Sequence, residues 1–206
     1  MNKFKSLSEI AGNAQSIESI LNEMEGSALN KPYAQLIKFV GGYSGRDLKL
    51  SEFYGLAHCV YGWMPRMLVL EEDLNLENLN KEWKSAEGGM PDCTEEKFYQ
   101  ELLKLCGNSI VGLSKLLHFS YPRKYAIIDS NVYKALRLNK KATLPNGLEK
   151  RIPLYSNYIK WISEIDEKNE VFEKIKKDSK SLISVSKNRL IEFYLYHRGK
   201  LLTVNG

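Results

Sequence analysis

An aspartate that follows a short apolar run is the residue of this sequence best placed to do chemistry. Residues 125–128 include Ala126, Ile127 and Ile128, and Asp129 comes next, where a helical pattern begins that runs to Leu136. An aspartate at a helix N-cap usually accepts backbone N–H hydrogen bonds, a structural role worth about 1 kcal/mol. Because the apolar run delivers it, we expect Asp129 to lie at the edge of the core rather than on an open surface.

A glycine-containing turn comes shortly before this aspartate. Residues 107–119 predict a short turn followed by a helix whose backbone amides begin near Val111 or Gly112. The free amides at a helix N-terminus bind anions such as phosphate. An anion site beside a positioned carboxylate suits chemistry on DNA, because one group would hold the backbone and the other would address the sugar.

The segment that joins the turn to the aspartate carries a family resemblance. Residues 107–132 resemble the helix-hairpin-helix core of the HhH-GPD superfamily of base-excision DNA glycosylases, and Ile128-Asp129-Ser130-Asn131-Val132 is similar to the Val-Asp-Thr-His-Val-like stretch that starts the helix after the hairpin. Residues 117–119 and 126–129 also resemble the divergent archaeal-type oxoguanine glycosylases. The chain end, residues 189–196, is similar to the closing helix of small relatives of that group.

The resemblance implies a function and a set of site residues. Asp129 would be the catalytic carboxylate, stabilising an oxocarbenium-like sugar and orienting the attacking water. The hairpin would hold the DNA backbone through Gly107, Asn108, Ser109, Gly112 and Ser114. Duplex DNA would be the partner, with the target nucleotide flipped into a pocket and held by side chains such as aromatic rings. The candidates for that pocket are Tyr61, Trp63, Arg66, His118, Tyr121 and Trp161.

These residues also have plainer interpretations. Asp129 could be only a helix cap, and Trp63 and His118 are more often core residues. Lys115 is the candidate nucleophile for a lyase reaction, but a solvated helix lysine is the more ordinary interpretation. In the archaeal-like register Ser114 rather than Lys115 falls on the lysine position, so the sequence favours monofunctional hydrolysis that leaves an abasic site.

Two other functions fit the same residues. The first is a non-catalytic nucleic-acid-binding module that uses the hairpin, with affinity that weakens steeply as salt rises. The second is a helical protein-interaction domain, for instance in a repair or phage-defence system, which would present an exposed apolar patch in place of a basic cleft.

Helical patterns that position these residues run through most of the chain. Apolar residues at helical spacing and turn residues between them predict an all-α, helix-hairpin-helix fold in one domain. Two lobes are the alternative, one of residues 1–90 with the C-terminal helices and one of residues 91–140. A capping box at Asp92–Glu95 is expected to start the helix before the hairpin, and a polar loop to cover residues 140–153. The closing helices are expected at residues 155–164, 170–180 and 186–198.

Composition narrows the class of protein. The 206 residues carry a formal net charge of +5, and the stretch from Tyr121 onward holds about nine excess positive charges, which suits a surface facing phosphates. No apolar run reaches the ~20 residues of a membrane span, so a cytoplasmic protein is expected. Three cysteines without Cys-x-x-Cys spacing and three scattered histidines predict no metal site, and no cofactor is expected.

Overall fold

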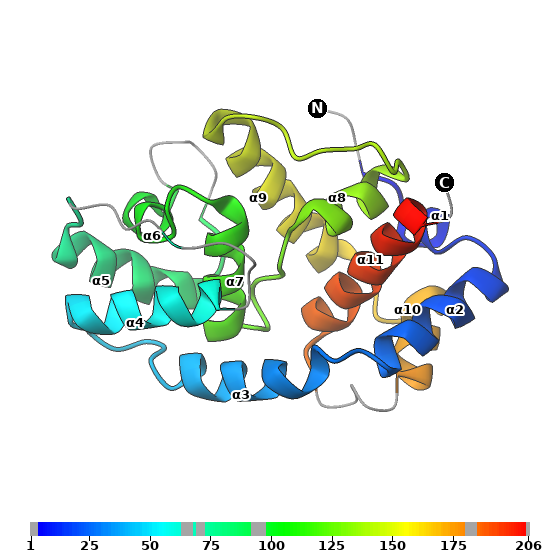
Figure 1. The fold of residues 1–206 in the computed structure, drawn as a ribbon, viewed down its shortest axis with the longest axis horizontal. Helices are drawn as coiled ribbons and strands as arrows, with labels where there is room; N and C mark the ends of the chain where they lie inside the picture. The colour runs from blue at the N-terminus through cyan, green and yellow to red at the C-terminus, as the bar shows by residue number, and fades with distance from the viewer. Residues whose placement is uncertain (1–3, 63–67, 69–72, 92–97, 180–184, 205–206) are drawn as a thin grey trace. The chain divides into compact units, whose positions relative to one another are not determined.

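The protein is all-helical in a computed structural model that describes residues 4–62, 68, 73–91, 98–179 and 185–204 (Figure 1). Within these residues it has eleven α-helices, one 3-10 helix and no strand. The predicted all-α fold class is therefore confirmed. None of the described helices is both long and apolar enough to span a bilayer.

The chain groups into two compact units, each built from separate segments. We call residues 29–127 and 146–159 the hairpin unit, and residues 1–28, 128–145 and 160–206 the terminal unit. The long helix α9 (Leu148–Glu164) contributes its first part to the hairpin unit and its end to the terminal unit. The expectation of a single domain stays a prediction.

The hairpin unit is built around α7 (Ile110–Ser120), and ten of its eleven residues are buried. A helix buried on all sides is mostly apolar, as the buried Leu113, Leu116, Leu117 and Phe119 show, and the polar residues Ser114, Lys115, His118 and Ser120 are buried with them. Around α7 pack α3 (Asn30–Gly41), α4 (Leu50–Tyr61) and α6 (Gln100–Leu105). Two further elements follow: α5 (Leu76–Ser85) packs with α6, and the 3-10 helix η1 (Ala86–Gly88) packs with α5.

The terminal unit is organised by α11 (Lys187–Val204), which lies alongside α8 (Ser130–Arg137) and α2 (Ala14–Glu25) (Figure 1). Its other helices are α1 (Leu7–Ala11) and α10 (Glu170–Asp178). A capping box at Ser6 and Glu9 starts α1, and the left-handed backbone of Gly12 (φ 73°) separates α1 from α2.

Two expectations about helices differ from the structure. The predicted loop over residues 140–153 is too long, since α9 begins at Leu148 and contains Pro153. A proline early in a helix removes one backbone hydrogen bond, and its carbonyl partner here belongs to the exposed Glu149, where water can replace it. α11 extends to Val204, six residues beyond the predicted end at Arg198. The capping box predicted at Asp92–Glu95 lies outside the described residues.

Candidate functional site

Asp129 caps α8, as its sequence context predicts. Its backbone is extended (φ −140°, ψ −174°), and its Oδ1 accepts the backbone N–H of Val132 at 2.9 Å. Ile128 before it is fully buried, whereas Asp129 is half-buried and Ser130 is exposed. The carboxylate therefore stands at the boundary between the core and the surface, at the positive end of a helix dipole that favours negative charge.

The start of α8 is fixed in place by α11. Gly199 on α11 approaches the backbone carbonyl of Asn131, two residues after Asp129, more closely than any side chain would permit. One turn further along both helices, the Lys134 ammonium donates a hydrogen bond to the Thr203 hydroxyl at 3.2 Å. This packing sets the direction in which α8 presents its N-terminus, and with it the place of Asp129.

The same face of α11 brings further polar groups near Asp129. Tyr196 is half-buried, and its pKa is raised by burial and by the negative charges of Asp129 and Glu192. Glu192 forms a buried ion pair with Arg189, whose guanidinium lies 4.2 Å from the centre of the Phe193 ring. Sequence reasoning missed this cluster because aromatic residues at helical spacing indicate a core. The sequence does hold a signal that could have revealed the cluster. Arg189, Glu192 and Tyr196 are spaced i, i+3, i+7, which places them on one helix face.

The hairpin between α6 and α7 spans Cys106–Ser109. Gly107 and Asn108 both have left-handed backbones, with φ of 57° and 55°. Their amides close the end of α6, because Gly107 N–H donates to Lys104 O at 2.8 Å and Asn108 N–H donates to Leu103 O at 2.9 Å. The Ser109 amide donates to Cys106 O at 3.1 Å. Three of the five residues predicted to hold the DNA backbone thus use their amides within the turn itself.

The N-terminus of α7 supplies other donors. Ser109 is its N-cap, with its hydroxyl accepting the Gly112 N–H at 3.2 Å. In the described part of the chain, no hydrogen bond joins the amides of Ile110 and Val111 to a protein acceptor. First-turn amides lack acceptors within their own helix, so these two are the backbone donors that the hairpin can offer to an anion.

Tyr61 supports the hairpin from α4. Its buried hydroxyl donates to the carbonyl oxygen of Cys106 at 2.7 Å. A Cβ added at Gly112 would lie 3.1 Å from the Tyr61 ring and 3.3 Å from the Cys106 Cβ. Gly112 is therefore a packing glycine, and Tyr61, a base-pocket candidate from the sequence, holds the turn in this structure.

His118 and Tyr121 are also tied into the core of the hairpin unit. His118 is fully buried, with Nδ1 at 2.7 Å from Tyr125 O and Nε2 at 2.9 Å from the Tyr33 hydroxyl. Since a carbonyl only accepts, Nδ1 carries a proton and donates it to Tyr125 O. The Tyr121 hydroxyl donates to Trp83 O at 3.0 Å and accepts the Gly45 N–H at 3.1 Å. Both side chains have the bonding of structural core residues.

The remaining candidates are spread over the chain. Ser114 is buried and donates to Val111 O at 2.9 Å, and Lys115 beside it is also buried. Trp161 belongs to the terminal unit, is half-buried and contacts Phe4 edge-on with ring centres 6.4 Å apart. Trp63 and Arg66 lie outside the described residues. Tyr61, Tyr121 and His118 share the hairpin unit with residues 107–115, whereas Asp129 belongs to the terminal unit.

Comparisons with known proteins add nothing to this geometry: no family model matches the chain, and no curated protein and no solved structure is significantly similar to it. Among the described residues, no group of three or more histidine, cysteine, aspartate or glutamate side chains is placed to hold a metal ion.

Proposed function

We propose that the protein is a DNA glycosylase-like hydrolase that cleaves the N-glycosidic bond of a damaged or modified base, with Asp129 as the catalytic carboxylate. The observation that carries this proposal is the position of Asp129. It is a half-buried helix cap at the end of a buried segment, reached nine residues after the end of α7.

The proposed chemistry uses the negative charge of Asp129. As the bond from C1′ to the base nitrogen breaks, the electron pair leaves with the base and the sugar becomes cationic. A preorganised carboxylate stabilises that developing cation. A water molecule oriented by the carboxylate then forms the new C1′–O bond, and the proton that it loses passes to the departed base nitrogen, which leaves an abasic site and the free, neutral base.

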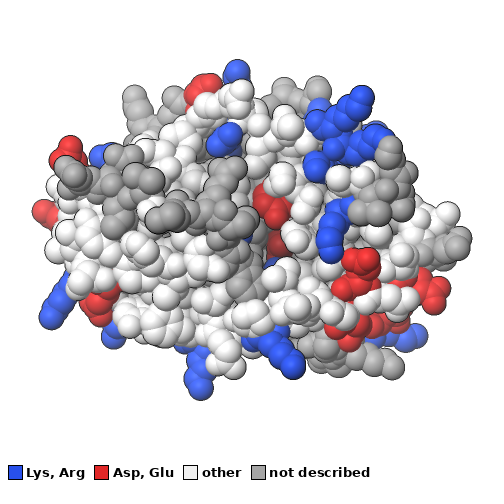
Figure 2. Space-filling view, viewed as in Figure 1, with Lys and Arg blue, Asp and Glu red and all other residues white. Residues whose placement is uncertain are grey.

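Each unit has its own group of donors suited to DNA phosphates. The first is the start of α7, with the amides of Ile110 and Val111. The second is a basic segment formed by α8 and the residues that follow it, Lys134, Arg137, Lys140 and Lys141. Figure 2 shows lysine and arginine side chains gathered where α8 and the following segment lie in Figure 1. Clustered cations of this kind supply the salt-dependent part of DNA affinity.

Base release tests the proposal directly. Wild-type protein and Asp129→Asn would be incubated with duplexes that carry oxidised, deaminated, alkylated or hypermodified bases, and alkali cleavage would reveal abasic sites. Asparagine caps a helix about as well as aspartate, so α8 should persist while the charge is lost. Abasic sites formed by the wild type and lost in the variant would support the proposal.

The control is Asp166→Asn, which removes a carboxylate from the loop between α9 and α10. Asp166 accepts the backbone N–H of Lys168 at 2.9 Å, a local turn bond that asparagine can also make. Base release equal to wild type is expected from this control. If Asp129→Asn were fully active too, Asp129 would not be the catalytic group. Tight, salt-sensitive DNA binding without release from any duplex would instead indicate the binding-module function.

A further inference from the structure

One edge of the hairpin unit presents an exposed aromatic residue beside basic ones. Phe39, near the end of α3, is 50% exposed, and it is one of two large hydrophobic residues that stand out in this way among those described. Its ring centre lies 5.5 Å from that of Tyr43. The Arg46 guanidinium covers the Tyr43 ring at 4.6 Å and is itself about half exposed. We call Lys31, Lys38, Phe39, Tyr43 and Arg46 the α3 surface.

The charge of this surface has one sign. From Gly26 to Arg46 the sequence holds Lys31, Lys38 and Arg46 and no acidic residue. Both lysines are exposed on α3. Figure 2 shows basic side chains and no acidic ones along the edge of the molecule where α3 lies in Figure 1. Glu52 pairs with the Arg46 guanidinium at 3.4 Å and holds it over Tyr43, and Asp47, the next residue, pairs with Lys84.

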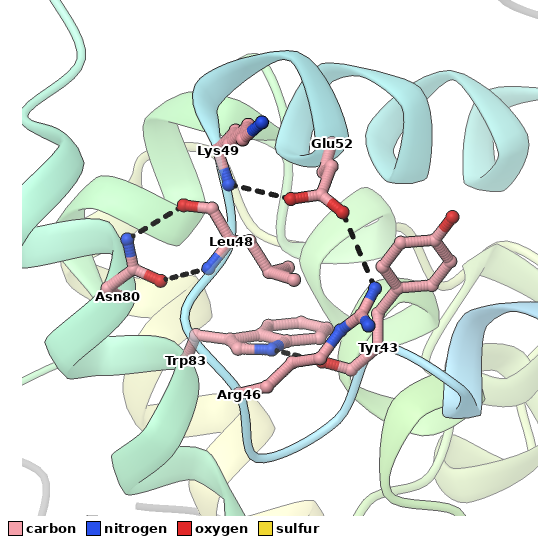
Figure 3. Close-up of polar contacts among 7 residues, drawn as sticks. All are labelled: Tyr43, Arg46, Leu48, Lys49, Glu52, Asn80 and Trp83. Carbon is pink, nitrogen blue, oxygen red and sulfur yellow. Dashed lines mark hydrogen bonds and ion pairs between the residues drawn. The ribbon is translucent and has the colours of Figure 1, made fainter.

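The loop that carries Tyr43 and Arg46 is held firmly by the helices beneath it. The indole nitrogen of Trp83 donates to the Tyr43 carbonyl at 3.0 Å, and the side chain of Asn80 bonds both the N–H and the carbonyl of Leu48 (Figure 3). The Ser44 hydroxyl also donates to Ser120 O at 2.9 Å. A loop fixed in this way presents its side chains without further ordering cost, which favours binding.

We propose that the α3 surface binds single-stranded nucleic acid, with an unpaired base stacked on Phe39 and the adjoining phosphates contacted by Lys31, Lys38 and Arg46. Aromatic rings and guanidinium planes are the groups on which unpaired bases stack, and a row of cations follows the backbone. A base paired within a duplex has its faces covered by its neighbours, so an exposed ring on a surface selects an unpaired base.

The composition of this surface favours nucleic acid over a protein partner. Stable protein interfaces bury about 800 Å² on each side around an apolar centre from which lysine is depleted. The α3 surface has one strongly exposed apolar side chain among three cations. The proposal goes beyond base excision and does not involve Asp129.

Fluorescence anisotropy with two labelled strands tests the stacking. One strand is a 12-residue oligothymidylate, and the other is a 12-residue abasic strand with the same number of phosphates. Wild-type protein should bind the thymidylate strand about tenfold more tightly, because one stacked base contributes on that order. Phe39→Ala should remove this difference. Leu76→Ala is the matched control, since Leu76 is the other exposed large hydrophobic residue, at 40%, and lies on α5.

The charges are tested by the salt dependence of the same binding. The double variant Lys31→Gln/Lys38→Gln should make the plot of log affinity against log salt concentration less steep by about 1.4. Each lost phosphate contact on a single strand accounts for about 0.7 of that change. Lys81→Gln, an exposed lysine on α5, should leave the slope unchanged. Equal affinity of the wild type for the two strands, or wild-type affinity of Phe39→Ala for the thymidylate strand, would overturn the proposal. So would a failure to bind either strand.

Discussion

Gly199 and the backbone of Asn131 are in direct contact: a Cβ placed on Gly199 would lie 1.9 Å from the Asn131 carbonyl oxygen. Real Cβ atoms do not approach oxygen at this distance, and the obstacle is backbone rather than a mobile side chain. The packing of α8 on α11, and through it the position of Asp129, therefore depends on a residue without a side chain.

Gly199→Ala should destabilise the protein by about 1 to 3 kcal/mol, because the added methyl group has to push α8 away from α11. Urea unfolding measures this change. Gly55→Ala on α4 is the matched control, since a Cβ at Gly55 meets nothing within 4 Å. That control should instead stabilise the protein by about 0.5 to 1 kcal/mol through helix propensity. Equal stability of the two variants would contradict the close contact.

Glu192→Gln should destabilise the protein by about 3 to 5 kcal/mol, because it removes the charge of the carboxylate that pairs with the buried Arg189. Glu164→Gln is the control. Its ion pair with Lys160 spans 4.0 Å and is largely exposed, so the loss should be no more than about 0.5 kcal/mol. Chemical unfolding of both variants gives the comparison, and a small loss for Glu192→Gln would show that the buried pair contributes little.

His197 should make stability depend on pH. Burial lowers its pKa from the ordinary 6.5, with Glu23 acting in the opposite direction and Lys200 and Arg189 reinforcing the decrease. A lowered pKa means that the unfolded chain binds the proton more readily. The stability that folding gains from keeping His197 neutral is thus fully present above pH 6.5. It is lost as the pH falls toward the pKa of His197 in the folded protein.

The measurement is the unfolding free energy between pH 7.5 and 5, in wild type and in His197→Gln. The variant should show a shallower decrease with acid than the wild type. His58→Gln, an exposed histidine on α4, should follow the wild-type curve. A His197→Gln curve parallel to that of the wild type would exclude this histidine as the source.

Asn80→Ala should destabilise the α3–α4 loop. The Asn80 amide group accepts the Leu48 N–H at 2.6 Å and donates to the Leu48 carbonyl at 3.0 Å, as Figure 3 shows. Leaving both groups of a partly buried peptide without this partner costs about 1 to 3 kcal/mol. Asn78→Ala, exposed on the same helix, should be close to neutral. Thermal unfolding, and hydrogen exchange at the Leu48 amide, would detect the difference.

Local signals identified several elements correctly. Asp129 was predicted to cap the helix that begins at Ser130, and it does, because an acceptor side chain before an apolar helical pattern is sufficient to start a helix. The turn before α7 was predicted from Gly107 and the residues after it. The sequence did not predict that the amides of this turn bond to Leu103 and Lys104. Those bonds, and the left-handed backbone at Asn108, arise only when α6 and α7 have formed.

Sequence by itself determined that the protein is all-α and that Asp129 begins a helix, since both follow from the spacing and type of residues close together in the chain. Tertiary structure decided which candidates serve the core. Tyr61, His118 and Tyr121 bond to Cys106, Tyr33 and Trp83, residues 38 to 85 positions away. It also brings Gly199 into contact with the backbone of Asn131 and leaves Phe39 exposed. Burial and contact between distant residues depend on how helices pack, and local periodicity carries no information about that.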